Sequence, residues 1–405
     1  MEIVVVGGGA SGMMAAIQAA VCGAKVTLLE QNEKLGKKIL ASGNGKCNMT
    51  NTLQEPSCYR GEHPEFAWDL LQMYGLQETI RFFTQLGVYT KNKNGWIYPY
   101  NEQAASVLEV LLMEMKHLKV KVKTNEEVTA IRSFDNGFEV KTKTWTYPCE
   151  RVIVATGSPA SAVKGSSDRG YTLAKAVGHP VIQPLPALVS LKGVGNYFPK
   201  WAGVRMEGAA TLLIEDEPHM TTRGELQFTD YGLSGIPIFQ FSRFAVKALE
   251  NGEKVTVTID FMPDFTDESL AVFLEKRVES CPYKSMKESL IGLLPKKLIP
   301  LIYSEFSSVS ELAGRLKRYP VGIKAAHSLE QAQVCSGGVD TSQLNCTSME
   351  SRLIPGLYFT GEVVDVDGDC GGYNLQWAWS SGAIAGKHAA RSSMEEVLVQ
   401  PKAEL

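Results

Sequence analysis

A glycine-rich turn near the start of the chain constrains the fold more than any other sequence feature. The apolar residues 3–6 are followed by Gly7, Gly9 and Gly12, and Glu30 ends the next apolar run. In a strand–turn–helix unit, the first glycine permits a tight turn, the second lets the backbone approach a pyrophosphate, and the third allows close packing of helix and strand. The pattern predicts a dinucleotide site; a fortuitous glycine turn is the alternative.

The residues around this turn predict how a dinucleotide would be held. A helix from Ser11 to about Cys22 would direct its N-terminal amides and the positive end of its dipole at the phosphates. Glu30 lies 18 residues after Gly12, where a carboxylate can accept hydrogen bonds from an adenosine ribose. We expect cofactor contacts from Gly7, Gly9, Ala10, Ser11, Gly12, Glu30 and Gln31.

The first apolar stretch is also long enough to suggest a membrane span or a signal peptide, since residues 3–24 carry no charge. However, Glu2 is the only charge ahead of it, and four glycines and a serine lie in its central part, residues 7–12. A buried parallel strand followed by a close-packed helix explains the same residues better. We therefore expect a soluble, cytoplasmic protein without a membrane segment.

The composition is that of an ordinary globular protein. The 405 residues suffice for two or three domains, and a net charge of −3 gives no electrostatic reason to expect nucleic acid as a partner. The eight cysteines form no CxxC pair, and the six histidines form no HExxH motif. These absences argue against a metal site, and the cysteines are expected to be reduced thiols.

A segment rich in small and amide residues follows the second predicted strand. Residues 36–51 read GKKILASGNGKCNMTN, which suits neither a strand nor a good helix. Such a loop could lay backbone N–H groups and asparagine side chains along a large polar ligand; a flexible basic surface loop is the alternative. The expected cofactor ligands here are Lys38, Ser42, Gly43, Gly45, Lys46, Cys47 and Asn48.

The next part of the chain alternates between helical and strand patterns. Helices are expected over residues 65–74, 76–86 and 101–116, the last capped by Asn101, with Ala105, Leu108, Leu112 and Met115 on its apolar face. Three short alternating strands over 127–148 then lead into a return strand that ends in Ala155, Thr156 and Gly157. This is the layout of the FAD-binding half of two-dinucleotide flavoproteins, in which Val128 and this last turn would also contact the cofactor.

The pattern of the sequence changes near Leu188. Short strand-like runs with frequent turns reach to Asp260, and Pro282, Pro295 and Pro300 divide a helical stretch into three or four short helices. The fold class expected is therefore α/β, in which a Rossmann-like FAD-binding domain (a parallel sheet plus a small antiparallel meander) is split by an inserted α+β domain with a barrel-like part and a helix cluster. The expected boundaries are 1–188, 189–335 and 336–405.

The C-terminal region returns to a cofactor-type pattern. An apolar strand ends in Gly361 and Glu362, whose carboxylate could reach ribitol hydroxyls, and Gly371 and Gly372 precede a helix rich in small residues. The N-terminus of such a helix favours the negative charge that a reduced isoalloxazine carries at its N1/O2 edge; an amphipathic core helix containing tryptophan is the alternative. The expected ligands are Gly361, Glu362, Gly372, Tyr373, Asn374 and Leu375.

The sequence resembles the BaiN/aminoacetone-oxidase-like family of NAD(P)/FAD-dependent flavoproteins along essentially its whole length. The resemblance rests on residues 7–12, 36–51, 337–341, 349–352 and 356–386, of which the strings GKKILASGNGKCN and GGYNLQWAWSSG are the most specific. It implies an FAD domain split by an insertion, and it does not fix a substrate. One departure lies at residues 229–235, where Asp230-Tyr231 stands in place of the family's frequent histidine, which puts that histidine's role in doubt.

Only one complete glycine fingerprint is present, since Gly193-Val194-Gly195 is followed by Pro199 rather than a helix. NAD(P)H would therefore dock transiently as electron donor, or the substrate itself would reduce the flavin. We expect an FAD-dependent oxidoreductase of a small organic substrate, with Cys47 and Tyr373 as candidate catalytic residues and the substrate bound near residues 36–51, under the inserted domain. The alternatives are an amine oxidase that uses dioxygen, an RNA-modifying flavoprotein and a non-catalytic flavin-binding protein; the sequence does not indicate the oligomeric state.

Overall fold

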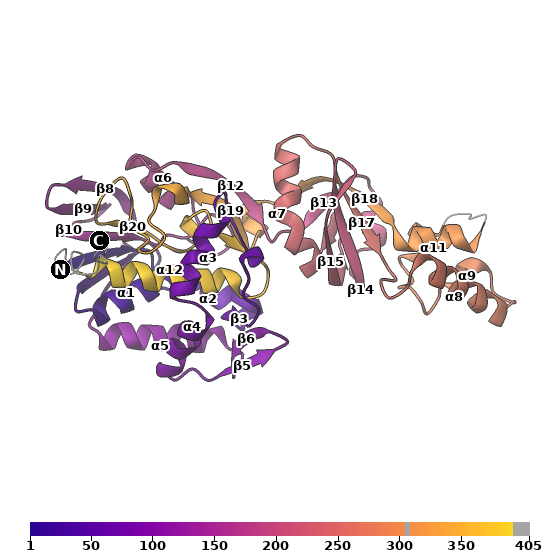
Figure 1. The fold of residues 1–405 in the computed structure, drawn as a ribbon, viewed down its shortest axis with the longest axis horizontal. Helices are drawn as coiled ribbons and strands as arrows, with labels where there is room; N and C mark the ends of the chain where they lie inside the picture. The colour runs from indigo at the N-terminus through magenta and orange to yellow at the C-terminus, as the bar shows by residue number, and fades with distance from the viewer. Residues whose placement is uncertain (304–307, 392–405) are drawn as a thin grey trace, which may run out of the picture. The chain divides into compact units, whose positions relative to one another are not determined.

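The computed structural model describes residues 1–303 and 308–391, which form two compact units (Figure 1). The first unit comprises Met1–Pro184 together with the chain from Val334 onward, and the second, inserted unit is Leu185–Gln333. Each unit has its own cluster of buried apolar side chains. No helix in these residues is both long and apolar enough to cross a membrane.

A five-stranded parallel sheet forms the centre of the first unit. Its strand order is β20 (Leu357–Phe359), β11 (Arg151–Val154), β1 (Glu2–Val6), β2 (Lys25–Glu30) and β7 (Lys121–Thr124). In β1 the residues after Glu2 are all buried, as expected of a strand covered on both faces. Because the strands are parallel, β1, β2, β11 and β20 all end at one edge of the sheet. The predicted glycine turn, Ala155 and Gly361 follow there, and Glu30 is the last residue of β2.

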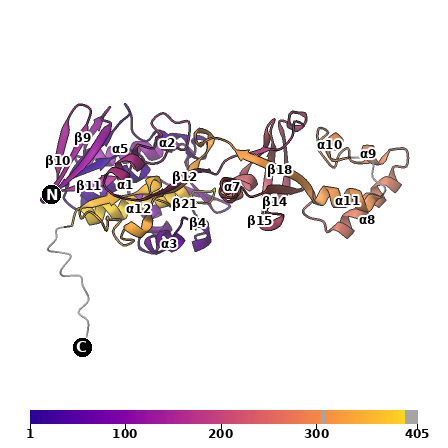
Figure 2. The same cartoon turned by 90° about the horizontal axis from the view of Figure 1, so that it is seen from above.

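Two helices from opposite ends of the chain pack against each other beside this sheet. They are α1 (Ala10–Val21) and α12 (Tyr373–Ala389), which lie side by side in both views (Figures 1 and 2). A Cβ atom at Gly382 would lie 2.4 Å from the carbonyl oxygen of Ser11, and one at Gly386 would lie 2.3 Å from that of Ala15. The glycines of α12 therefore let two helix backbones approach closely, which joins the C-terminal segment to the N-terminal motif.

The remaining elements of the first unit surround this core. They comprise a three-stranded antiparallel meander, a second three-stranded sheet, two strand pairs and further helices. The meander is β8 (Val128–Phe134), β9 (Gly137–Thr142) and β10 (Thr146–Cys149), and the second sheet is β3 (Thr50–Asn51), β6 (Trp96–Pro99) and β5 (Thr90–Lys93). The pairs are β12 (Val181–Ala187) with β19 (Val334–Val339) and β21 (Asp367–Gly368) with β4 (Tyr59–Arg60). The helices are α2 (Lys37–Ala41), α3 (Pro64–Met73), α4 (Leu76–Gln85), α5 (Ala104–His117) and α6 (Arg169–Ala176).

The inserted unit combines a closed antiparallel barrel with helices. The barrel order is β13 (Leu191–Gly193), β16 (Gly232–Ser234), β15 (Glu217–Phe228), β14 (Val204–Ile214), β17 (Val255–Asp260) and β18 (Tyr319–Ala326). The helices are α7 (Ile236–Glu250), α8 (Asp267–Ser280), α9 (Met286–Ser289), α10 (Ile299–Ile302) and α11 (Val309–Lys317). The predicted fold class, including the parallel sheet, the meander, the barrel and the helix cluster, is confirmed.

Two predictions about α5 were wrong. Asn101 does not cap α5, which begins at Ala104; its side chain instead accepts a hydrogen bond from the Gln103 N–H (3.2 Å) in a turn before the helix. The buried face of α5 is Ala104, Val107, Leu108, Leu111 and Met115, so Ala105 and Leu112 point away from the core.

Candidate functional site

In the turn after β1, neighbouring atoms leave no room for a side chain at Gly7 or Gly12, whereas the space beside Gly9 is open. Gly7 has φ +107°, and a Cβ there would lie 2.4 Å from the Ala155 carbonyl oxygen. A Cβ at Gly12 would lie 1.9 Å from the Gly7 carbonyl oxygen. At Gly9, in contrast, no atom lies within 4 Å of such a Cβ. The turn thus exposes its backbone only where a pyrophosphate is expected to approach.

The helix that follows this turn begins without a capping side chain. Its first turn contains Ala10 and Ser11 and no acidic residue, so nothing negative competes for its N-terminal amides. The Ser11 hydroxyl is directed away from this end and donates to the Thr360 carbonyl oxygen (3.4 Å). The start of α1 is therefore suited to bind an anionic group through its backbone.

Glu30 lies at the end of β2 and is a buried residue, 7% exposed. One carboxylate oxygen accepts the Gly8 N–H (2.8 Å), and the other accepts the backbone N–H (2.8 Å) and side-chain amide (2.7 Å) of Asn32. Glu30 therefore fastens the glycine turn in addition to its expected contact with a ribose. Because two carboxylate oxygens offer about four acceptor positions, room remains for a ribose hydroxyl.

Two further expected ligands, Gln31 and Val128, are positioned by contacts near the end of β2. The Gln31 side chain donates to the Gly165 carbonyl oxygen (2.6 Å), which ties it to the loop before α6. Val128 is buried at the start of β8. The chain just before it is anchored to the end of β2, because the Glu126 N–H donates to the Glu30 carbonyl oxygen (2.9 Å). Val128 is thus held at the adenosine end of the expected site.

Residues 36–51 are more ordered than the sequence predicted. Gly36, with φ +69°, starts the short helix α2, and the 3-10 helix η1 (Ser42–Gly45) follows it. The prediction of neither helix nor strand was therefore wrong for residues 37–45, which are helical, and for Thr50–Asn51, which form β3. Gly43, Asn44 and Cys47 have φ values of +56°, +54° and +58°, so the chain turns repeatedly through the left-handed region.

The side chains of this segment have varied surroundings. The Ser42 hydroxyl donates to the Ile39 carbonyl oxygen (2.6 Å), and a Cβ at Gly43 would lie 2.9 Å from the Asn48 backbone nitrogen. Gly45 has open space around its Cβ position, the nearest atom being 3.9 Å away. Asn48 is buried, and its amide donates to the carbonyl oxygens of Thr50 (3.0 Å) and Ile97 (3.2 Å) in the orientation that satisfies both.

A cluster around Glu362 joins four segments that are distant in the sequence. One carboxylate oxygen pairs with the Lys38 ammonium (2.6 Å). The other accepts the Ser158 hydroxyl (2.7 Å) and the Cys335 N–H (3.2 Å). Lys38 and Glu362 were both predicted as cofactor ligands, and they contact each other. Ser158 and Cys335 were missed; Ser158 directly follows the Ala-Thr-Gly turn, whereas nothing in the sequence marked Cys335.

The Ala155-Thr156-Gly157 turn lies directly beside the first glycine turn. The Ala155 N–H donates to the Val6 carbonyl oxygen (2.8 Å), and its own carbonyl lies against Gly7. The Thr156 hydroxyl is buried without a hydrogen-bond partner among the described residues and faces α6, where a Cβ at Gly170 would lie 1.9 Å from it. Gly157 has φ +70° and no atom within 4 Å of a Cβ position, so this turn too is open at one glycine.

The C-terminal segment contacts both the start of α1 and the end of the 36–51 segment. Gly361 has φ +75°, and a Cβ there would lie 2.3 Å from the Ser11 hydroxyl oxygen. Gly372 has φ +100°, and a Cβ there would lie 2.6 Å from the backbone of Thr50. The Asn51 side chain donates to the Gly371 carbonyl oxygen (2.9 Å). The start of α12 is therefore packed backbone to backbone against the end of the 36–51 segment.

Side chains of α12 fix this contact. Asn374 forms a pair of hydrogen bonds with the Gly368 backbone (2.9 Å each), and Leu375 packs on the hydrophobic core. The fully buried Gln376 accepts the Thr50 hydroxyl (2.6 Å) and donates to Thr79 (2.9 Å). The Trp377 and Trp379 indole N–H groups donate to the carbonyl oxygens of Gly361 and Met49 (3.1 Å each). The roles of Gln376, Trp377 and Trp379 were missed, although the unusual Gln-Trp-Ala-Trp string was a visible signal.

The two candidate catalytic residues are both buried. Cys47 has no exposed surface, and burial raises the pKa of its thiol to about 12. The Tyr373 ring lies edge-on to Tyr59 with centroids 5.7 Å apart, and burial, then the neighbouring Cys58, raises the pKa of its phenol. Both groups stay protonated at neutral pH. The geometry thus gives no support to Cys47 as a thiolate nucleophile, whereas a neutral phenol at Tyr373 can donate a hydrogen bond.

These features fit an extended dinucleotide such as FAD. The first glycine turn is open at Gly9 and the Ala-Thr-Gly turn at Gly157, where phosphates need backbone approach, and Glu30 is buried beside the first turn. The helices α1 and α12 both begin without a capping side chain or an acidic residue in the first turn. Both belong to the first unit, and Ser11 of α1 packs against Gly361 and against Gly382 of α12. Among the described residues, no group of three or more His, Cys, Asp or Glu side chains could hold a metal ion.

Comparison with known proteins gives relatives over nearly the full chain. The family described as the HI0933-like protein Rossmann domain matches residues 1–388. The 3-dehydro-bile acid delta(4,6)-reductase of Clostridium scindens is 43% identical, over 96% of this chain and 99% of that protein. The ribosomal RNA dihydrouridine synthases of Escherichia coli and Haemophilus influenzae are 31% and 30% identical, each over 94% of this chain and 96% of the relative.

Proposed function

We propose that this protein reduces a carbon–carbon double bond conjugated to a carbonyl group in a flat, steroid-like small molecule. The chain belongs to the HI0933-like Rossmann family and is an FAD-dependent oxidoreductase. The observation that carries this proposal is the 43% identity to a bile acid reductase over 96% of the chain. The resemblance seen in the sequence is thereby confirmed at the level of the family, and the substrate is the proposed step beyond it.

The other two relatives support the same reaction class. Dihydrouridine is uridine with one carbon–carbon double bond reduced, so all three names describe addition of two hydrogens to a double bond. They also give a second candidate function, the reduction of uridine in ribosomal RNA. The sequence alone predicted no nucleic-acid partner, and the net charge of −3 agrees with a small molecule. The identity of 31% against 43% makes RNA the second candidate.

The residues of the site have separable proposed roles. The backbone at Gly9, Ala10 and Ser11 would hold the pyrophosphate, Glu30 the adenosine ribose, and the segment 42–51 with the start of α12 the isoalloxazine. In the reduction a hydride and a proton add across the double bond. Bound FAD, once reduced by NAD(P)H that docks transiently, would supply the hydride and return to its oxidised form. Tyr373 is the proposed hydrogen-bond donor to the substrate carbonyl. Cys47, buried and protonated, is reassigned to holding the loop.

An anaerobic stopped-flow experiment tests this function. Holoprotein is first mixed with NADH, NADPH or an aliphatic amine to see which one bleaches the flavin absorbance. The reduced protein is then mixed with a 3-oxo steroid carboxylic acid that has double bonds at positions 4 and 6, or with a ribosomal RNA fragment. We expect bleaching by NADH or NADPH and rapid return of the absorbance with the steroid acid.

Three outcomes would contradict the proposal. Bleaching by the amine and return only with dioxygen would indicate an amine oxidase. Return of absorbance with RNA but not with the steroid would support the second candidate. A protein that neither accepts electrons nor passes them on would not be an enzyme of this class. As a control, Tyr373→Phe removes only the hydroxyl group and should slow the second step while leaving flavin reduction by NAD(P)H unchanged.

A further inference from the structure

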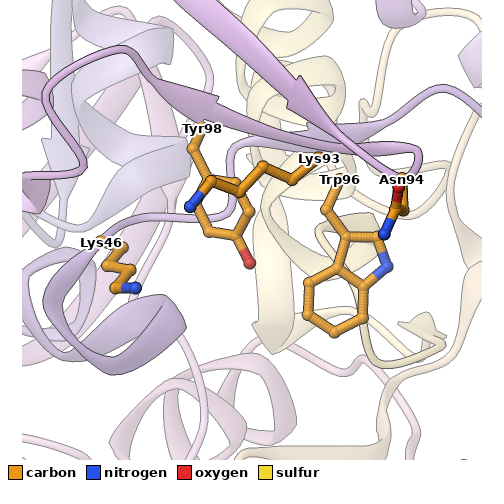
Figure 3. A pocket seen from close by; sticks show the side chains of 5 residues that line it. All are labelled: Lys46, Lys93, Asn94, Trp96 and Tyr98. Carbon is orange, nitrogen blue, oxygen red and sulfur yellow. The ribbon is translucent and has the colours of Figure 1, made fainter.

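A cavity of about 430 Å³ lies in the first unit between the β5–β6 hairpin and the segment that carries Lys46 (Figure 3). Its lining is both aromatic and cationic: Trp96 and Tyr98 come from β6, Lys93 comes from β5 with its ammonium 6.0 Å from the centre of the Tyr98 ring, and Lys46 comes from the other segment. A volume of this size lies within the range of about 300–1,000 Å³ that is typical of small-molecule sites.

The cavity adjoins the residues expected to surround the isoalloxazine. A Cβ at Gly371 would lie 3.3 Å from the Trp96 indole nitrogen, so this ring borders the start of α12. A Cβ at Gly43 would lie 3.6 Å from the Tyr98 ring, so the second ring borders the turns of the 36–51 segment. Both aromatic walls thus connect the cavity to the segments that flank the proposed flavin.

The cationic side carries a net positive charge. Three lysines converge on one carboxylate, Glu102: Lys46 at 3.0 Å, Lys91 at 2.5 Å, and Lys93 in direct contact. Lys91, then Lys93 and Lys46, hold the pKa of Glu102 well below its usual range, so the carboxylate is ionised. Three positive charges against one negative charge leave this group at +2. The Lys46 and Lys93 side chains are half exposed, at 50% and 48%, and can turn toward a ligand.

We propose that this cavity binds the acidic end of an anionic, flat-ringed substrate, with Lys46 and Lys93 on the acid and Trp96 and Tyr98 against the apolar body. The proposal rests on the proposed function, and it adds that the enzyme selects a carboxylic acid over the neutral form of the same molecule. An RNA phosphate is the other anion that such lysines could hold. A carboxylate is favoured because two lysines and two aromatic rings line a pocket of about 430 Å³, which suits one charged group on a flat apolar body.

The test compares a steroid carboxylic acid with its methyl ester, which has the same ring system without the charge. Both are titrated into holoprotein at equilibrium, by quenching of tryptophan fluorescence, and both are used as substrates to obtain kcat/KM. We expect the wild-type protein to bind the acid more tightly than the ester. Lys46→Gln and Lys93→Gln should each weaken binding of the acid by about three- to tenfold, and binding of the ester by less than about twofold.

Lys91→Gln is the matched control, because it makes the same change of charge at a residue that does not line the cavity. It should retain most of the preference for the acid. FAD content is measured for every variant, since loss of flavin from Lys46→Gln would show that this lysine clamps the cofactor instead.

The outcomes separate this proposal from the proposed function. Equal binding of acid and ester by the wild type, or equal weakening of both by the variants, would overturn the role of the lysines even if both compounds are reduced. Acid-selective binding without turnover of either compound would overturn the proposed function and leave the anion site in place. Weaker binding of a ribosomal RNA fragment by Lys46→Gln, with no effect on the acid, would assign the lysines to phosphate and refute the carboxylate.

Discussion

Replacement of Gly9 by alanine is expected to separate cofactor binding from folding. The backbone at Gly9 has φ −82° and ψ −169°, which alanine adopts without strain. No atom lies within 4 Å of a Cβ built at this position. Gly9 is the N-cap of α1, where glycine is somewhat better than alanine, so the free energy of unfolding of the apoprotein should fall by at most about 1 kcal/mol.

The same methyl group would occupy the opening through which a pyrophosphate approaches the backbone. An overpacked contact costs about 1–3 kcal/mol, and about 1.4 kcal/mol changes an equilibrium constant tenfold. The affinity for FAD should therefore fall by about 5- to 150-fold. Gly12→Ala is the matched control: its Cβ would lie 1.9 Å from the Gly7 carbonyl oxygen, so it should destabilise the apoprotein itself.

Two measurements on the apoproteins decide the matter. FAD is titrated into each and its binding followed by flavin fluorescence, and unfolding in urea is followed by circular dichroism. If Gly9→Ala binds FAD as the wild type does, the pyrophosphate does not lie at this turn. If Gly9→Ala destabilises the apoprotein as much as Gly12→Ala does, the opening at Gly9 has been misjudged.

Four further predictions follow from the same account. Acid precipitation should release one FAD per chain; flavin that stays with the precipitate would contradict non-covalent binding. Glu30→Ala should lower FAD affinity at least about tenfold, since a charge-assisted hydrogen bond contributes about 1.5–3 kcal/mol; unchanged flavin occupancy after dialysis would count against it. Burial raises the pKa of Cys47 from 9.0 to about 12, so the unfolded thiol ionises first and stability should decline from about pH 9 to pH 12. Cys47→Ala should make this decline shallower, and an unchanged slope in urea titrations would refute the linkage. Limited proteolysis, monitored by mass spectrometry, should cut near residues 188 and 336 before it cuts within residues 7–12; the reverse order would argue against an inserted domain.

The sequence predicted the fold well at positions where neighbouring backbone atoms leave no room for a side chain. Gly7 and Gly12 occupy positions where a Cβ would meet backbone atoms at 2.4 Å and 1.9 Å, so no other residue fits and the pattern is unambiguous. The small residues after Gly372 indicated a close-packed helix for the same reason, and Gly382 confirms it. Such steric requirements are local and can be read from spacing alone.

Residue types that occur in more than one kind of local structure, such as helix caps and turns, were less reliable guides. Asn101 has the right residue type for a helix cap, but its side chain closes a turn two residues further on, and the helix begins at Ala104. This shift changed the assignment of the apolar face, because Leu112 then points to solvent while Leu111 is buried. Because Gly43 and Asn44 are typical turn residues, the short helical segments around them were predicted as a loop.

Contacts between distant segments were not predictable. Glu362 was expected near a cofactor, but the sequence gives no means of finding Ser158 and Cys335 as its partners. The three lysines around Glu102 come from two stretches of sequence and converge only through the β5–β6 hairpin and the turns before it. The cavity beside Trp96 and Tyr98 therefore became visible only in the fold.

A crystal structure of the protein with FAD tests the central claim most directly, namely that both ends of the chain form one flavin site. The account predicts electron density for the pyrophosphate within hydrogen-bond distance of the backbone amides that follow Gly9, and for the adenosine ribose at Glu30. It also predicts the isoalloxazine between the segment 42–51 and the start of α12 at Gly372. An isoalloxazine bound away from Gly372, or a dinucleotide whose phosphates lie away from Gly9, would contradict it.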